Sequence, residues 1–258
     1  ENPELTTSEP YVMGSHATGS GAWCSGPEDV SPPEYFWGYN RMTTIEGLFG
    51  AGDAVGGTPH AFSSGSFTEG RLAAKAACKY IDDGKAEGIV VSDAQINRRK
   101  EEIYKPLEHY KTYRNAIVAG SVNPHYINPK QGLDRLQKLM DEYCGGVTVN
   151  YMTNEKLLNI GLKKLKIMEE DLEKLAAEDV HELLRAWELK HRHRAAECVT
   201  QHTLFRKETR WPGYYYRGDA MKLDDANWHV LTVSRRDPKT GEYTMEKAPC
   251  YHLVGDEK

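Results

Sequence analysis

The segment 43–75, TTIEGLFGAGDAVGGTPHAFSSGSFTEGRLAAK, constrains the fold of this chain more than any other part of the sequence. Its apolar pair Leu48 and Phe49 predicts a buried strand that ends at Gly52-Asp53, followed by a glycine- and serine-rich loop and an amphipathic helix that begins near residues 63–66. A carboxylate at the end of a strand can accept hydrogen bonds from ligand hydroxyl groups. The unpaired N–H groups at the start of the helix suit an anion or an electron-rich ring.

The glycines alone are weak evidence for a binding site, because glycine at the end of a strand usually serves only a tight turn. The ordered combination of strand, Gly-Asp, GGTPH, SSGS and helix resembles the second flavin motif of the fumarate reductase and succinate dehydrogenase flavoprotein superfamily. Three further segments look like the alpha subunit of dissimilatory adenylylsulfate reductase, and the likeness covers nearly the whole chain. They are PYVMGSH at 10–16, WCSGPEDVSPPEY at 23–35 and RKETRWPGYYYRGDAMKLDDANW at 206–228.

This resemblance implies FAD as the cofactor and the interconversion of adenylylsulfate with AMP and sulfite, through a sulfite adduct at the flavin N5. Electrons would come from a partner beta subunit that carries 4Fe-4S clusters. Dicarboxylate-handling members of the superfamily have a histidine and an arginine that clamp the substrate carboxylates. At the matching positions this chain has Pro10 in place of the histidine and Ala61 in place of the arginine, which argues against fumarate or succinate as the substrate.

The resemblance also assigns roles to individual residues. The expected cofactor-binding residues are Gly52, Asp53, His60, Ser63, Ser64 and Ser66. The histidine is also the predicted catalytic residue, since it would lie on the substrate side of the flavin and donate to a sulfite or sulfonyl oxygen. Each assignment has a structural alternative: the histidine packs against the turn, the aspartate caps it, and each serine caps the helix.

Composition and charge exclude other classes of function. The net charge of −5 comes from 33 basic and 38 acidic residues that are mixed along the chain, which argues against a nucleic-acid surface. No apolar run approaches the ~20 residues of a membrane helix, and the first ten residues lack the features of a secretory signal. His191 and His193 would point to different faces of a helix, so we predict no metal site there.

The five cysteines predict reduced thiols in the cytoplasm, because their number is odd and they form no C-x-x-C pair. This spacing provides no four-cysteine cluster motif, so any iron–sulfur cluster would belong to a partner.

The predicted fold class is α+β, with four regions: the end of a capping domain at 1–40, the C-terminal part of an α/β FAD-binding domain at 41–91, a helical domain at 92–200, and an aromatic segment with short strands at 201–258. Ser92 is expected to cap the first helix of the bundle, which Pro106 should kink. A second helix is expected at about 131–143. A turn at 237–241 predicts a β-hairpin between VLTVS and YTM.

Two further helices of the bundle are predicted from their apolar periodicity. The helix that starts near Thr153 carries a predicted core stripe of Leu158, Leu162, Leu165, Met168, Leu172 and Leu175. The helix that follows carries a predicted stripe of Val180, Leu183, Leu184, Trp187, Ala195 and Cys198.

The resembled alpha subunit begins with a G-x-G-x-x-G loop that holds the FAD pyrophosphate, and no such loop precedes the segments described above. The chain is therefore predicted to be the C-terminal part of a longer protein and to be inactive alone. Two other functions stay open: another flavin oxidoreductase of the same superfamily, and a non-catalytic docking fragment.

Overall fold

The computed structural model describes residues 20–56, 63–116, 123–210 and 215–250, and it divides the chain into two compact units. The first unit ends at Val90 and the second begins at Val91. Helices and short strands occur together in this structure, which confirms the α+β class.

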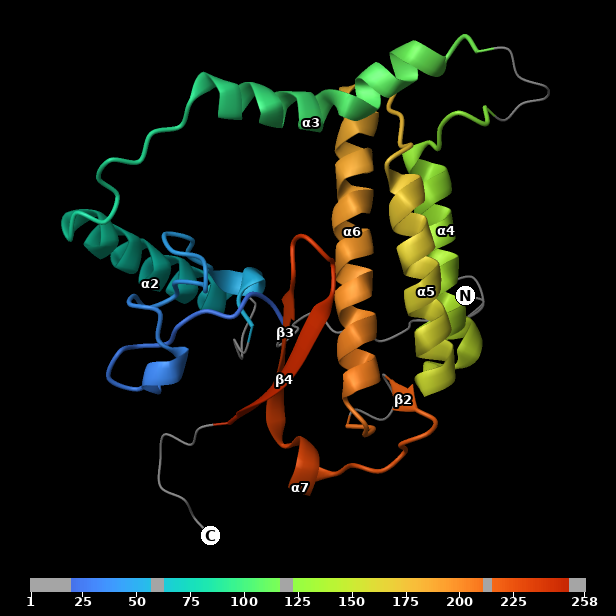
Figure 1. The fold of residues 1–258 in the computed structure, drawn as a ribbon. Coiled ribbons are helices and arrows are strands. Elements are labelled where there is room, and N and C mark those ends of the chain that lie inside the picture. Colours follow the sequence, from blue (N-terminus) through green and yellow to red (C-terminus); the bar gives the residue numbers. More distant parts are fainter. Residues whose placement is uncertain (1–19, 57–62, 117–122, 211–214, 251–258) are drawn as a thin grey trace, which may run out of the picture. The chain divides into compact units, whose positions relative to one another are not determined.

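In the first unit, the main element is helix α2, Ser63–Asp82, which starts where the glycine- and serine-rich loop predicted it (Figure 1). Two single-turn 3₁₀ helices, η1 at Pro33–Tyr35 and η2 at Gly52–Ala54, precede it. Gly84, with a φ of +74°, follows the end of α2, and its N–H donates to the Ile81 carbonyl at 2.9 Å. Glycine in this left-handed conformation is a common end to a helix.

The predicted strand at Leu48 and Phe49 is wrong. Phe49 makes only an isolated antiparallel bridge to Met42, and the Leu48 side chain is 50% exposed. The reason is a tight local turn: the N–H of Thr43 donates to the Leu48 carbonyl at 2.8 Å, and Gly47 adopts a φ of +76°. The chain therefore doubles back here before a strand can extend.

An aromatic cluster, formed by Tyr39, Phe49 and Tyr80, joins the turn to α2. The three rings pack edge to face, with centroids 5.2 to 6.5 Å apart. Such pairs add to the stabilisation that burial of the rings provides. Phe49 is thus a partly buried packing residue of the first unit, although it does not belong to a strand.

In the second unit, four helices carry the fold. They are α3, Asp93–Tyr113; α4, Pro129–Tyr143; α5, Glu155–Leu172; and α6, Val180–Phe205. Figure 1 shows α4, α5 and α6 side by side, with α5 antiparallel to the other two, while α3 crosses the end at which α6 begins.

Each of these four helices begins at a polar cap. The side chains of Ser92, Asn128, Asn154 and Asp179 each accept a hydrogen bond from the backbone N–H three residues later. The cap predicted at Ser92 is therefore confirmed. Pro106 lies inside α3, where it removes one helical hydrogen bond, and the Trp187 indole N–H of α6 donates to the nearby Ile103 carbonyl at 3.0 Å.

The hydrophobic core of the second unit lies between α4, α5 and α6. The stripe predicted on α5 is confirmed at its main positions, because Leu158, Leu165, Met168 and Leu172 are all buried. On α6 the prediction was partly wrong, since Val180 is 70% and Leu184 is 55% exposed. The predicted Leu183 is buried, and the other residues that α6 buries were not in the predicted stripe: Ala186, Leu189, His193, Ala196 and Thr200. The small side chains in this stripe let the neighbouring helices approach closely.

The predicted hairpin is confirmed: β3, Val230–Arg236, pairs antiparallel with β4, Tyr243–Pro249. In the turn between them, the Asp237 carboxylate accepts hydrogen bonds from the N–H groups of Lys239 at 2.7 Å and Thr240 at 2.8 Å. The hairpin lies along α6 in Figure 1. Smaller elements complete the unit: η3 at Val147–Val149, β1 at Met152–Thr153 parallel to β2 at Tyr216–Arg217, and α7 at Asp225–Trp228.

His202 joins α6 to the hairpin and should make the stability of the second unit depend on pH. Its two ring nitrogens lie 3.0 Å from Thr232 Oγ1 and 2.9 Å from Ser234 Oγ. Burial, and secondarily the Arg206 cation, lowers the pKa of His202 below its ordinary value of 6.5. The unfolded chain therefore binds this proton more readily, so the stabilisation is complete above about pH 6.5 and is lost as the pH falls below it.

Urea unfolding at about pH 7.5 and pH 5.5, where most carboxylates remain ionised, measures this effect. We expect the unfolding free energy to be lower at pH 5.5 than at pH 7.5, and we expect this decrease to be smaller in His202→Gln. The control His181→Gln removes an exposed histidine of the same helix and should leave the decrease in unfolding free energy unchanged. An equal fall in His202→Gln and the unaltered protein would contradict the prediction.

None of the helices in the described ranges is both long enough and apolar enough to cross a membrane.

Candidate flavin site

The turn at Gly52-Asp53 and the start of α2 lie against each other. Gly52 is buried and has a φ of +63°, a conformation that glycine adopts without strain. A Cβ atom at this position would lie 3.4 Å from Ser66 Oγ. The structure therefore brings together Gly52, Asp53 and Ser66, three of the predicted cofactor-binding residues, and leaves the Asp53 side chain exposed.

The other side of the turn is held by a short run of backbone hydrogen bonds. The N–H of Ala22 donates to the Ala54 carbonyl at 2.7 Å, and the N–H of Gly56 donates to the Ala22 carbonyl at 2.9 Å. A Cβ atom at Gly21 would lie 2.6 Å from the Ala54 carbonyl oxygen, so only glycine fits there. These contacts fix the backbone that carries Asp53.

The first turn of α2 provides the helix start that was predicted. Ser63, Ser64 and Ser66 all lie in it and have exposed side chains. The first four N–H groups of a helix have no acceptor within it, and the positive end of the helix dipole adds to their attraction for an electron-rich group.

A hollow of about 500 Å³ lies over this part of the helix, lined by Ser66, Phe67, Thr68, Gly70 and Arg71. Its volume is in the range of small-molecule sites. Its lining suits a flavin, because the Arg71 guanidinium favours an electron-rich edge and the Phe67 ring offers an apolar surface. The nearby carboxylate of Asp53 can accept hydrogen bonds from a hydroxyl-bearing chain.

His60, the predicted catalytic residue, lies outside the described residues, as does the rest of the segment 57–62. His16 also lies outside them. The role of His60 in catalysis and in flavin binding therefore stays a prediction.

An ion pair between Arg41 and Glu69 lies directly behind the turn and was not predicted. The Arg41 Nη2 donates to Glu69 Oε1 at 2.8 Å and the Nε donates to Oε2, so the pair is bidentate. The two side chains are only 18% and 8% exposed. Because they are 28 residues apart in the sequence, no local pattern identifies them as partners.

All five cysteines lie in the described ranges and are free thiols. In the same ranges, no three histidine, cysteine, aspartate or glutamate side chains gather as they would around a metal ion. His191 is exposed, whereas His193 is buried, with its Nε2 2.8 Å from the Leu165 carbonyl oxygen.

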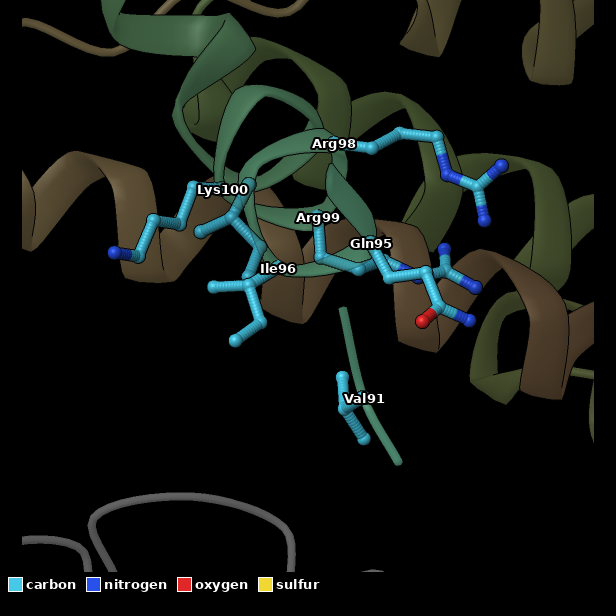
Figure 2. A pocket seen from close by; sticks show the side chains of 7 residues that line it. Val91, Gln95, Ile96, Arg98, Arg99 and Lys100 are labelled. Atoms are coloured by element: carbon cyan, nitrogen blue, oxygen red, sulfur yellow. The ribbon is translucent and has the colours of Figure 1, made fainter. Parts of the chain in front are cut away.

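A second hollow, of about 440 Å³, lies in the second unit beside the first half of α3. Figure 2 shows Gln95, Arg98 and Arg99 extending to one side of the helix and Lys100 to the other. It is lined also by Val91, Ile96 and Ile103 and contains none of the predicted site residues.

Comparison with known proteins finds relatives that match nearly the whole chain. Residues 133–253 match the family model of the fumarate reductase flavoprotein C-terminus. The chain is 41% identical, over 97% of its length, to the adenylylsulfate reductase alpha subunit of Megalodesulfovibrio gigas. This alignment covers 39% of that relative, so the chain spans about two fifths of its length.

Solved structures show the same relationship. The adenylylsulfate reductase of the hyperthermophilic Archaeoglobus fulgidus matches 95% of the chain with a TM-score of 0.87 and 51% identity, over 39% of its own chain. A structure of adenosine-5-phosphosulfate reductase in complex with sulfite as a covalent adduct matches equally well, with the same TM-score, identity and coverage. Along nearly its whole length the chain is therefore similar to the C-terminal part of adenylylsulfate reductase alpha subunits, and its residues 133–253 match the fumarate reductase flavoprotein C-terminus.

Proposed function

We propose that this chain is the C-terminal part of the alpha subunit of an FAD-dependent adenylylsulfate reductase, which interconverts adenylylsulfate with AMP and sulfite in dissimilatory sulfur metabolism. The observation that carries the proposal is the structural match to the Archaeoglobus fulgidus enzyme, at 51% identity over 95% of the chain. The covalent sulfite adduct in a matched structure supports the same chemistry.

In this proposal the residues of the first unit hold and orient the cofactor. Asp53 accepts hydrogen bonds from the ribityl hydroxyls, while the backbone N–H groups of Ser63 and Ser64 face an electron-rich edge of the ring system. When bound, FAD supplies the two-electron redox chemistry. His60 donates a hydrogen bond to a sulfite or sulfonyl oxygen and stabilises the charge that develops there.

The proposal includes a partner and a location. A beta subunit with 4Fe-4S clusters exchanges electrons with the flavin, since the five free cysteines of this chain provide no four-cysteine cluster motif. Free thiols in this number are typical of a reducing compartment, which favours the cytoplasm.

The decisive test uses the complete protein, purified with its partner. We expect release of AMP and sulfite from adenylylsulfate when a reductant is added, and no reduction of fumarate. Fumarate reduction without AMP release would instead favour another oxidoreductase of the same family. Absence of a flavin absorption band from the purified protein would favour the docking fragment.

The 258 residues expressed alone should bind FAD weakly. In two-domain flavoproteins of the dinucleotide-binding type, a G-x-G-x-x-G loop holds the cofactor pyrophosphate, and the described residues offer only the turn at Gly52-Asp53 and the start of α2. Titration of the purified chain with FAD, followed by flavin fluorescence, measures the affinity. Tight binding of one FAD per chain would contradict the prediction.

A further inference from the structure

We propose that Arg41 and Glu69 are positioning residues for the flavin site: together they hold the Gly52-Asp53 turn against the start of α2 in the one orientation that lets both contact the cofactor. This inference rests on the proposed function. It concerns two residues that lie behind the site and do not themselves contact the flavin.

The side chain of Arg41 holds the helix. Its guanidinium makes two hydrogen bonds to the Glu69 carboxylate, one of them the 2.8 Å bond from Nη2 to Oε1. A bidentate pair fixes the angle between its two partners as well as their separation. Because Glu69 follows Ser66 by three residues on α2, the pair sets the orientation of the helix start.

The backbone of Arg41 holds the other half of the site. Its carbonyl accepts a hydrogen bond from the N–H of Gly50 at 2.9 Å, two residues before Gly52. Its own N–H donates to the Ser25 carbonyl at 2.8 Å. The main chain of Arg41 therefore bonds to the segment that leads into the turn, and its side chain bonds to the helix.

The backbone conformation of Arg41 also supports this role. Its φ of +62° lies in the left-handed region, which residues other than glycine adopt at an energetic cost. Such conformations persist where surrounding contacts over-determine them, and they cluster at binding sites and active sites. Here the ion pair and the two backbone hydrogen bonds provide those contacts.

Because the pair is buried, breaking it should disturb the flavin site and not only change the charge at the protein surface. Glu69 is 6% exposed as a residue. Removing one partner leaves the other charge buried and unpaired, so the neighbouring segments must shift to bring water to it. The elements free to shift are the turn and the helix start, since these are what the pair joins.

The experiment uses the complete protein loaded with FAD, with four variants: Arg41→Gln, Glu69→Gln, the double variant and Arg41→Lys. Arg135→Gln is the matched control, because it breaks a partly exposed ion pair, with Asp171, in the second unit. The readouts are the FAD dissociation constant, the visible flavin spectrum and the bleaching of that spectrum by added sulfite. All are taken well below the melting temperature of each variant.

We expect each single glutamine variant to bind FAD about tenfold more weakly or worse and to need more sulfite for bleaching. Arg41→Lys should recover part of the loss, because lysine keeps the charge but makes only one of the two bonds. The double variant should lose less than the sum of the single variants, since it leaves no unpaired charge. Arg135→Gln should match the unaltered protein.

Two outcomes overturn the inference separately. If the glutamine variants melt earlier but keep the flavin affinity, spectrum and sulfite response of the unaltered protein, the pair serves stability alone and the proposed function stands. If the unaltered complete protein binds no flavin, the proposed function fails, and the inference fails with it.

Discussion

Replacing Arg217 with methionine should lower the unfolding free energy by about 3–5 kcal/mol, because it removes a buried cation that bonds both to Asp219 and to several backbone carbonyls. The Arg217 side chain is only 1% exposed, and its Nε donates to Asp219 at 2.9 Å. Its Nη1 donates to the carbonyl of Thr203 in the last turn of α6, at 2.5 Å, and to the carbonyl of Arg206 just after the helix, at 2.7 Å. Methionine fills a similar space but leaves these buried acceptors without a donor.

Urea unfolding of Arg217→Met beside Arg235→Met measures this effect. Arg235 is 63% exposed and lies 3.6 Å from Glu246, so its loss should cost less than about 1 kcal/mol. The pKa of Asp219 provides a second measurement. Hydrogen bonds from Arg217 lower the pKa of this carboxyl to about 2, so the pKa should rise when Arg217 is replaced. Equal losses in the two variants would show that Arg217 does not hold the end of α6.

Replacing His60 with alanine in the complete enzyme should lower turnover about 10²–10³-fold, the usual cost of losing a donor to a developing oxyanion. The flavin should remain bound, since Asp53 and the start of α2 are unchanged. The measurement is AMP release from adenylylsulfate, normalised to the flavin absorption of each preparation.

The matched variant is His16→Ala, which removes the other histidine that lies in a glycine- and serine-rich stretch of the sequence. Loss of turnover in His60→Ala alone supports the assignment. Loss in His16→Ala alone transfers the catalytic role to that residue, and unchanged turnover in His60→Ala rejects the assignment. Loss of flavin from His60→Ala would show a binding role in place of a catalytic one.

The sequence predicts the helices well because their signals are local. Ser92 stands three residues before Gln95, and the structure shows each side chain bonded to the backbone of the other. The turn residues around Asp237 likewise identify the hairpin, since the carboxylate bonds to the next N–H groups along the chain. On α5, apolar residues recur at the helical period with little interruption.

Other features depend on contacts that no short pattern contains. Val180 and Leu184 have the spacing of one helix face, yet both are exposed. Helix α6 instead buries its small residues Ala186 and Ala196 in the core. The apolar pair Leu48-Phe49 has the composition of a strand, but the hydrogen bond from the N–H of Thr43 to the Leu48 carbonyl closes a turn first. The bond between Arg41 and Glu69 joins distant segments, so only the folded structure identifies it.

Helix α6 gives the second unit its cooperativity. At 26 residues it is about 39 Å long. Trp187 near its beginning bonds to α3, its middle packs against α4 and α5, and His202 near its end bonds to β3. Because all these elements contact the same continuous helix, none can detach without exposing part of the buried stripe of α6. Heating should therefore melt them together as one transition, and the slowest backbone amides to exchange with deuterium should be those in the middle of α6.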